Sequence, residues 1–247
     1  MKKIVIFVVL ALVAAIGGAV WMFPMSMAAE FAAKQVPDFK YASATGSVWD
    51  GKLTDVSYGE QKIGDLTVKA DLMQALTGKA AGQLGLVRQG FTGSTGIVWP
   101  VGKKDVTLSS LKVGGDVVNV PGMPGVVAMS GGKFTLELKN LVFANNICQT
   151  ASGEVWTDAL AKLNERGWTG PELRGPVTCT EGKIQVQASG KAATGEDVLA
   201  VMNISSHLDM KMTAKVVGAQ GPAIQALIDM GFKPEGDGLV IRQSIGS

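Results

Sequence analysis

The sequence predicts a mainly β protein: an N-terminal transmembrane helix followed by an extended, curved, largely antiparallel β-sheet domain with two or three short covering helices. Three observations support this prediction. Residues 4–23, IVIFVVLALVAAIGGAVWMF, contain no charged side chain. From Phe39 onward, apolar residues recur with a period of two, which is typical of half-buried strands. The chain also contains 32 glycines, which supply turns between many short strands.

Residues 4–23 have the length of a membrane-spanning helix. At about 1.5 Å rise per residue, such a helix spans about 30 Å, the thickness of a bilayer's hydrocarbon core. Two lysines precede the segment, so the positive-inside rule predicts that residues 1–3 form a cytoplasmic tip and that the rest is exported. A cleaved secretory signal is the alternative, because Ser26 and Ala28 form a small-x-small pair that a peptidase could recognise.

Residues 24–39 are expected to form a juxtamembrane segment. They are rich in alanine and helical in character up to Pro37. Phe31 and Val36 would rest on the lipid interface if the segment forms an amphipathic helix. A plain tether is the alternative. Residues 40–247 are then expected to form the β-rich domain, with a soft boundary near residues 125–148.

Strands are expected to follow one another through this domain. Asp50-Gly51 is interpreted as a hairpin turn, and strands are expected on both sides of the turn Glu181-Gly182. The segments in which apolar residues alternate are residues 41–48, 53–58, 63–70, 84–87, 91–99, 106–120, 134–139, 184–188, 198–204, 208–217 and 239–242.

Three short helices are expected beside these strands. Asp71 would cap the first, over residues 72–76, because its side chain can accept hydrogen bonds from unpaired N–H groups. Residues 156–166 form the second, with these apolar side chains on one face: Ala159, Leu160 and Leu163. The third begins at Gly221-Pro222 and ends at Gly231, with these side chains facing inward: Ala223, Ile224, Leu227 and Ile228.

The chain contains two cysteines, Cys148 and Cys179. In an oxidising compartment a lone pair of cysteines most often forms a disulfide, and closing a loop of this length stabilises a fold by about 3–4 kcal/mol in the chain-entropy model. Two buried free thiols are the alternative. No metal site is expected, because the chain has one histidine, His207, and no second close pair of cysteines.

A short motif, Gly-x-hydrophobic-Trp, occurs three times along the chain. It places a large ring and a glycine at set positions on a strand, where glycine lets the backbone bend or lets the ring lie over it. This pattern predicts similar strand–turn units, with the tryptophans packing on the sheet or, alternatively, lining a ligand groove. The three copies are Gly46 with Trp49, Gly96 with Trp99, and Gly153 with Trp156.

Charge and motif content argue against several classes of function. Without Lys2 and Lys3, the chain holds 21 basic and 21 acidic residues, so no basic surface for nucleic acid is expected. No glycine loop matches a phosphate-binding or dinucleotide-binding motif. Histidine-based catalysis would require His207, which lies in a strand pattern typical of a structural residue. We therefore expect no catalytic residue, no cofactor and no metal.

Taken together, these segments resemble the type II secretion system protein N family, which comprises bitopic inner-membrane components of the machinery that exports folded proteins across the outer membrane. The likeness covers nearly the whole chain, although residues 123–132 and the glycine-rich middle depart from the pattern. It rests on the basic start with residues 4–23, on ATGSVWDG at residues 44–51, on Cys148 with ASGEVW at residues 151–156, on Leu173-x-Gly175-Pro176-Val177-x-Cys179 with EGKI at residues 181–184, and on Gly231-Phe232 with Gly238-Leu239.

The resemblance implies a non-enzymatic protein of the cell inner membrane, single-pass, with a cytoplasmic N-terminus and a periplasmic domain. Its implied partners are other secretion components and, through residues 4–23, the bilayer. A periplasmic protein that binds lipid in a curved β-sheet trough is the alternative, because residues 134–139 alternate between apolar and charged side chains. If helices at residues 157–166 and 223–230 cover the apolar face, that face is ordinary core.

Overall fold

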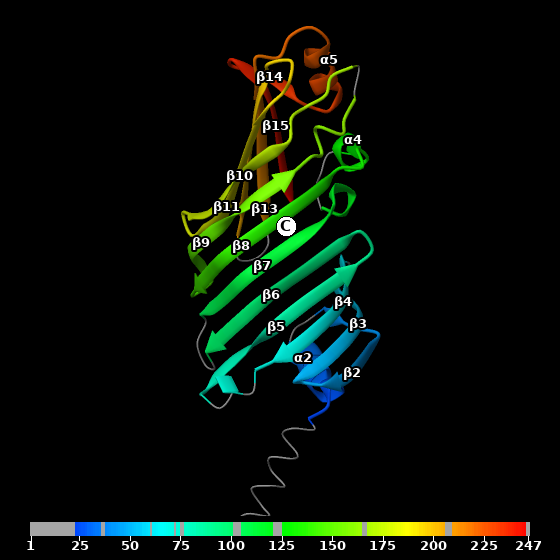
Figure 1. Cartoon of the computed structure of the whole chain (residues 1–247), viewed down its shortest axis with the longest axis vertical. Coiled ribbons are helices and arrows are strands. Elements are labelled where there is room, and N and C mark those ends of the chain that lie inside the picture. The colour runs from blue at the N-terminus through cyan, green and yellow to red at the C-terminus, as the bar shows by residue number, and fades with distance from the viewer. Residues whose placement is uncertain are drawn as a thin grey trace, which may run out of the picture. The chain divides into compact units, whose positions relative to one another are not determined.

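The structure is a computed structural model, and it divides the chain into two compact units, Met1–Arg88 and Gln89–Ser247 (Figure 1). The soft boundary expected near residues 125–148 stays a prediction. Fifteen strands lie in the described part of the chain, and every strand pair recorded within each unit is antiparallel. The described residues are 23–35, 38–59, 61–71, 73–74, 77–100, 105–120, 125–164, 167–205 and 209–245.

The first unit is a small antiparallel sheet with one helix on it. The strands lie in the order β1-β3-β4-β5, and β2 also pairs with β3. Alternation of apolar and polar residues along β3 gives it one buried and one exposed face, as the period of two predicts. The elements are α2 Met25–Gln35, β1 Phe39–Lys40, β2 Ser43–Ser47, β3 Asp50–Tyr58, β4 Gln61–Ala70 and β5 Lys79–Arg88.

The prediction that Asp50-Gly51 forms a hairpin turn is wrong. The loop between β2 and β3 consists of Val48 and Trp49, because Ser47 already pairs with Asp50. Gly51 serves a different purpose, since a Cβ there would lie 2.8 Å from Cγ of Met25 on α2. The missing side chain therefore lets the helix pack directly on the strand.

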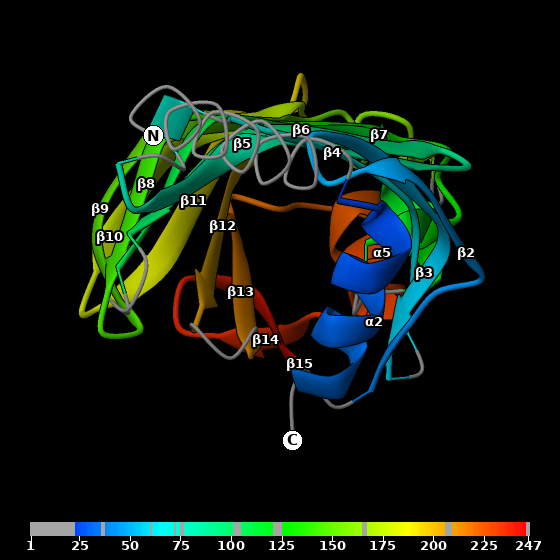
Figure 2. The same cartoon turned by 90° about the horizontal axis from the view of Figure 1, so that it is seen from below.

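The second unit is a longer antiparallel sheet with strand order β6-β7-β8-β9-β10-β11-β12-β13-β15-β14. The sheet bends between β8 and β15, and α5 lies inside the bend (Figure 2). The strands are β6 Phe91–Pro100, β7 Val106–Asp116, β8 Lys133–Ala144, β9 Ile147–Thr157, β10 Leu173–Thr180, β11 Lys183–Lys191, β12 Asp197–Ile204, β13 Met210–Val217, β14 Lys233–Glu235 and β15 Gly238–Ile245, with η1 Val117–Asn119, α4 Gly125–Ala128 and α5 Pro222–Asp229.

The helix expected at residues 222–230 is confirmed as α5, but its predicted inward face is partly wrong. Pro222 occupies the first turn and Gly231 follows the helix with φ 95°, as predicted. Leu227 is only 1% exposed and belongs to the main apolar cluster of this unit. Ile224 and Ile228, however, are 40% and 39% exposed, because Ala223 and Ala226 take the buried positions beside Leu227.

The helix expected at residues 156–166 is absent from the described part of that range, which ends at residue 164. β9 continues through Thr157, which pairs with both Phe134 on β8 and Leu173 on β10. Asp158 accepts a hydrogen bond from the Lys133 backbone N–H (2.6 Å), so its carboxylate is held by the sheet. A hydrogen-bonded turn follows, in which the expected apolar side chains still reach the core: Ala159, Leu160 and Leu163.

The first expected short helix is described only in part. Asp71 Oδ1 accepts hydrogen bonds from the backbone N–H groups of Met73 (2.9 Å) and Gln74 (3.2 Å), as a capping residue does. Met73 and Gln74 are helical, and the other residues of the range 72–76 lie outside the described residues. Among the described residues, no helix is long and apolar enough to cross a membrane. All of the expected anchor except Phe23 lies outside that part.

Candidate functional site

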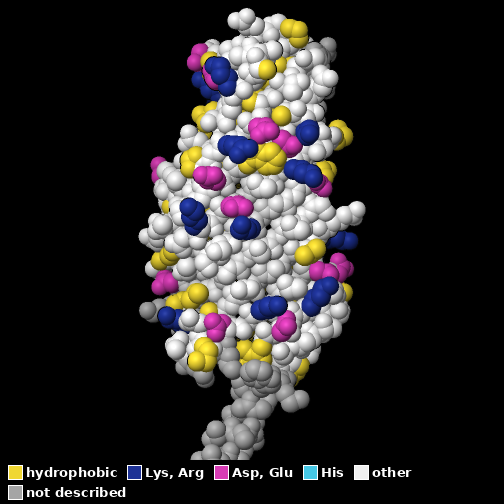
Figure 3. Space-filling view, in the orientation of Figure 1, with side chains coloured by type: hydrophobic (Ala, Val, Ile, Leu, Met, Phe, Trp, Pro, Cys, Tyr) yellow, Lys and Arg dark blue, Asp and Glu magenta, His cyan; other side chains and the backbone are white. Residues whose placement is uncertain are grey.

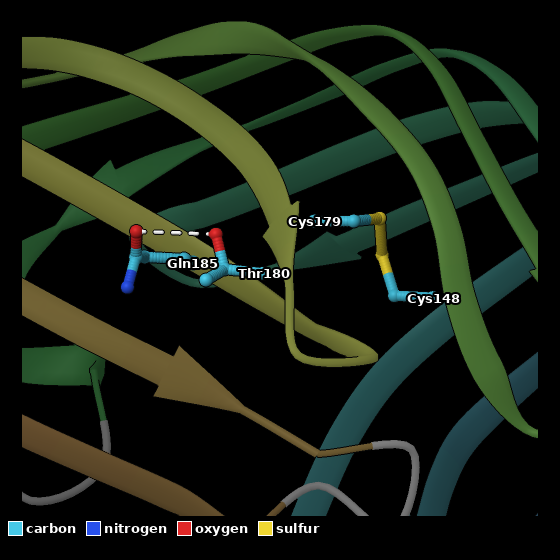
Figure 4. The surroundings of a disulfide bond; sticks show 4 residues. All are labelled: Cys148, Cys179, Thr180 and Gln185. Carbon is cyan, nitrogen blue, oxygen red and sulfur yellow. Dashed lines mark hydrogen bonds between the residues drawn. A yellow bond between two sulfur atoms is a disulfide. The ribbon is translucent and has the colours of Figure 1, made fainter.

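A disulfide joins Cys148 on β9 to Cys179 on β10 (Figure 4). The two Cα atoms lie 5.6 Å apart, and 31 positions separate the cysteines in the sequence. Paired residues of the β9–β10 ladder run from Thr157 opposite Leu173 to Gly153 opposite Val177. The disulfide lies beyond that last pair, where the Cys148 N–H also donates to the Gly182 carbonyl oxygen (2.9 Å). The bond therefore holds the two strands together past the end of their ladder.

The disulfide is packed in an apolar cluster on one face of the second sheet. Cys148 is buried with Leu138, Leu141 and Val177. Around these residues lie half-buried apolar side chains from four strands, β7, β8, β9 and β11: Leu108, Leu111, Leu136, Phe143, Ala151, Val155, Ile184 and Val186. Its buried residues are distinct from those of the cluster that contains α5, and the half-buried Val155 packs against both clusters.

Rows of apolar side chains cross β11, β12, β13 and β15 on the face that packs against α5, which we call the inner face. The row of Val198, Val216 and Leu239 is fully buried in the cluster that contains α5. Farther along the strands, toward the disulfide, the rows are half-buried. No described helix belongs to the apolar cluster around the disulfide. These half-buried rows are Ile184–Ile204–Met210 and Val186–Met202–Met212.

The opposite, outer face of the same strands is polar. Gln185, Asn203 and Lys211 form one cross-strand row, and Gln185 donates a hydrogen bond to Asn203 (3.2 Å). Lys191 pairs with Asp197 across β11 and β12 at 3.2 Å. Figure 3, in the view of Figure 1 with β6 to β9 in front, shows basic and acidic side chains interspersed without a large patch of either sign. This is the wet side of a sheet whose other side is apolar.

The outer edge of β15 is open over residues 241–245. β13 pairs with the whole of β15, whereas β14 covers only residues 238–240. Pro234 lies in the middle of β14 and has no N–H to donate, which suits an edge strand. Within the described residues, no strand pairs with this edge beyond Val240.

The glycines of the three Gly-x-hydrophobic-Trp copies each lie against a neighbouring strand. Gly46 pairs with Gly51, Gly96 with Ser109, and Gly153 with Leu138. The last two lie beside register shifts in their ladders. A Cβ at Gly153 would lie 2.6 Å from Cδ2 of Leu138, so the position has no room for a side chain. The glycines permit close backbone approach, as expected for a structural motif.

The tryptophans of the motif lie on different structural elements. Trp49 lies in the β2–β3 loop, Trp99 near the end of β6, and Trp156 near the end of β9. Within the second unit, β7 and β8 separate the strands that carry Trp99 and Trp156. The motif therefore marks local strand features, and within the second unit Trp99 and Trp156 lie on strands that are not neighbours.

Trp156 takes part in a polar cluster that the sequence pattern did not indicate. Its indole N–H donates to Glu172 Oε2 (2.9 Å), and the Arg174 guanidinium lies 5.8 Å from the ring centroid. The hydrogen bond from Trp156, with a further one from Arg174, lowers the pKa of the Glu172 carboxyl below its ordinary value. The sequence does not indicate Glu172 and Arg174 as partners of Trp156, because Arg174 lies opposite Trp156 only when β9 and β10 pair.

No group of three His, Cys, Asp or Glu side chains in the described residues could hold a metal ion. His207 lies outside the described residues. The buried carboxylate of Glu196 accepts a hydrogen bond from the Thr194 hydroxyl in the turn between β11 and β12. This hydrogen bond within the turn accounts for the burial of the Glu196 carboxylate.

The fold and the disulfide define a β-sheet protein with an open strand edge and an apolar inner face. A model of the family "Type II secretion system (T2SS), protein N" matches residues 37–242. The chain belongs to this family, which confirms the resemblance found in the sequence. Neither the comparison with curated proteins nor the comparison with solved structures finds a match.

Proposed function

We propose that this protein is an inner-membrane-anchored periplasmic component of a type II secretion system and that it supports export of folded proteins through protein–protein contacts rather than catalysis. Membership of the secretion family over residues 37–242 supports the assignment to the machinery. The uncharged residues 4–23 and the two preceding lysines support the single-pass anchor with a cytoplasmic N-terminus. The proposed periplasmic domain is residues 40–247, with residues 24–39 next to the membrane.

The observation that carries the proposed mode of contact is the open edge of β15. A strand edge with unpaired N–H and C=O groups can add an extended segment of a partner by main-chain hydrogen bonds. In this protein, the edge over residues 241–245 includes the exposed Arg242 and Ser244. The other end of the same strand is blocked by β14 and Pro234. Docking is therefore directed to residues 241–245.

Photo-crosslinking at two matched serines tests this contact. Ser244 lies on the open edge, whereas Ser189 lies on β11 in the middle of the sheet, and both are exposed. A photoreactive amino acid replaces each serine in turn in the full chain, in cells that carry an active secretion system. We expect position 244 to capture a secretion component identified by mass spectrometry and position 189 to capture none.

Two results would contradict the proposal. Equal capture at positions 189 and 244 would show that the edge has no special role in contact. Unchanged export of secreted proteins after deletion of the gene would remove the role in secretion altogether. The same experiment with a chain that lacks residues 4–23, and that a cleavable signal directs to the periplasm, measures how far anchoring contributes to capture at position 244.

A second candidate function is binding of lipid or another hydrophobic ligand on the inner face. One observation favours it: the inner-face rows Ile184–Ile204–Met210 and Val186–Met202–Met212 are only half-buried. α5 covers the row of Val198 and Val216, and the methionine rows beyond it stay half-buried. Methionine side chains adapt readily to apolar ligands of varied shape.

Mass spectrometry of an organic extract from the purified protein tests this candidate. A lipid that co-purifies with the protein and is lost in the Met202→Glu variant supports it. Met202 faces the half-buried end of the inner face, and Val201→Glu on the adjacent, opposite-facing position is the matched control. An extract free of lipid, from protein purified without detergent, would contradict it.

A further inference from the structure

The exposed side of α2 carries apolar side chains that the first unit does not bury. Met27 is 55% exposed and Phe31, one turn later, is 65% exposed. Phe23, immediately before the helix, is 41% exposed. Large apolar residues clustered in this way mark a surface that contacts something other than water. We call these three residues the α2 stripe.

The other side of α2 is fixed to the first sheet. Met25 and Ala29 are buried in one apolar cluster with Leu53 and Val56 of β3. Met25 lies over Gly51, where a Cβ would come within 2.8 Å of its Cγ. The helix can therefore not roll to bury the α2 stripe without leaving the sheet.

The chain entering α2 is also fixed to the sheet. The Phe23 carbonyl oxygen accepts a hydrogen bond from the Val48 N–H (3.1 Å), and Pro24 forms a β-bridge with Ser47. The sequence that precedes this point, residues 4–22, is uncharged. Because those residues directly precede Phe23, any bilayer that holds them must reach the start of α2. At about 1.5 Å per helical residue, Phe31 then lies within about 12 Å of Phe23.

The charged residues of α2 are exposed and border the α2 stripe. Glu30 and Lys34 form an ion pair at 2.8 Å and are 64% and 69% exposed. The hydrogen bond and charge of Lys34 lower the pKa of Glu30, and Glu30 raises the pKa of Lys34, so both stay charged at neutral pH. An apolar stripe beside a charged, exposed stripe is the pattern of a helix that lies in the plane of a membrane interface.

From these observations we infer that the α2 stripe lies in the headgroup–acyl boundary of the bilayer and orients the first sheet relative to the membrane. The inference rests on the anchor of the proposed function and goes beyond it. Anchoring through residues 4–23 alone leaves the first sheet free to turn about the point where the chain enters α2. A helix that is held by the sheet on one side and by lipid on the other removes that freedom.

Depth-dependent fluorescence of the full chain in vesicles tests this inference. The structure has no free cysteine among its described residues, and both cysteines of the chain are in the disulfide, so single cysteines can be labelled selectively under non-reducing conditions. The variants Met27→Cys and Phe31→Cys place an environment-sensitive fluorophore on the stripe. Ser26→Cys is the matched control, because Ser26 is exposed on the same helix about 140° around the axis from Phe31.

Each labelled chain is reconstituted in vesicles of phosphatidylethanolamine and phosphatidylglycerol, with and without brominated acyl chains. We expect bromine to quench the label by about half or more at positions 27 and 31, and iodide in the buffer to quench it at position 26. Flotation of the vesicles reports separately whether the chain is anchored. Equal thermal midpoints of the three variants establish that each is folded.

Two outcomes would overturn the inference while leaving the anchor intact. In the first, the chain floats with the vesicles, but iodide rather than bromine quenches positions 27 and 31, so the stripe faces water. In the second, neither agent quenches them, so protein covers the stripe, either a second copy or another protein. A chain that does not float would refute the anchor itself, and the inference with it.

Discussion

Cys148 and Cys179 are joined at a point where β9 and β10 no longer pair, beyond Gly153 opposite Val177. The segment between these strands, residues 158–172, makes a wide connection without a described helix. A covalent bond at the far end of the ladder limits how far the two strands can separate. The disulfide therefore links β9 and β10 where their own ladder no longer joins them.

Removal of the disulfide should lower the free energy of unfolding by about 3–4 kcal/mol in the chain-entropy model. The double variant Cys148→Ala/Cys179→Ala, measured by urea denaturation, tests this, and reduction of the natural protein should reproduce the loss. Mass mapping without reductant should recover one peptide pair that contains both cysteines. Free thiols at both positions in exported protein, or an unchanged urea midpoint, would contradict the prediction.

Gly153 should tolerate no larger side chain. A Cβ there would meet the Glu137 carbonyl oxygen and Leu138, both part of the neighbouring strand, so the β8–β9 ladder must shift. We expect Gly153→Ala to destabilise the protein by about 1–3 kcal/mol, the usual cost of overpacking. Gly125→Ala is the control, because nothing lies within 4 Å of a Cβ at that position. Similar thermal midpoints for the two variants would show that close strand approach is unimportant at Gly153.

The two faces of α5 should respond differently to truncation. Leu227 is fully buried, so Leu227→Ala leaves a cavity and should cost about 2–5 kcal/mol. Ile228→Ala, one position along, removes an exposed side chain and should cost less than about 1 kcal/mol. Chemical denaturation of both variants measures the difference. If Ile228→Ala lowered the free energy of unfolding more than Leu227→Ala, Ile228 would face inward, as the sequence predicts.

Acid should destabilise the β14–β15 hairpin through Glu235. Arg242 donates two hydrogen bonds to the Glu235 carboxylate, at 2.6 and 2.7 Å, and thereby lowers the pKa of Glu235 from its ordinary value of 4.5. A carboxyl whose pKa is lower in the folded state stabilises the fold above its unfolded pKa. That contribution is lost as pH falls below 4.5 and through the folded value.

The variants Glu235→Gln and Arg242→Gln should each flatten this part of the pH dependence. Thermal midpoints recorded between neutral pH and acid pH measure it. Either variant removes one partner of the pair, so both should show the same reduced slope. If the natural protein and the two variants lose stability in parallel below pH 4.5, the ion pair does not contribute, as is common for exposed pairs.

Several elements could be predicted from the sequence because their signals are local. Pro222 and Gly231 bound α5, and Asp71 caps the turn at Met73, as capping chemistry requires. Alternation along residues 134–139 correctly placed β8. These signals work because each depends on side chains within one turn or one strand of the residue concerned.

Predictions failed where a distant segment decided the local structure. The helical spacing of residues 156–166 was overridden because Thr157 pairs with Phe134 and Leu173, so the start of this range extends β9 and a turn follows it. Asp50-Gly51 resembled a turn, but Gly51 was needed for contact with Met25. The open edge of β15 and the half-buried end of the inner face could not be anticipated, since each depends on which strand lies next to which.

For this protein, the amino-acid sequence by itself determined the β-rich class, the glycine-punctuated strand order along the chain and the cysteine pair, because alternation, turn residues and two lone cysteines are properties of neighbouring residues. Only the tertiary structure decided where the disulfide lies relative to the β9–β10 ladder, which side of α2 stays exposed and which strand edge is open. The physical reason is that strand pairing and helix packing join residues far apart in the chain, and no local pattern encodes their register.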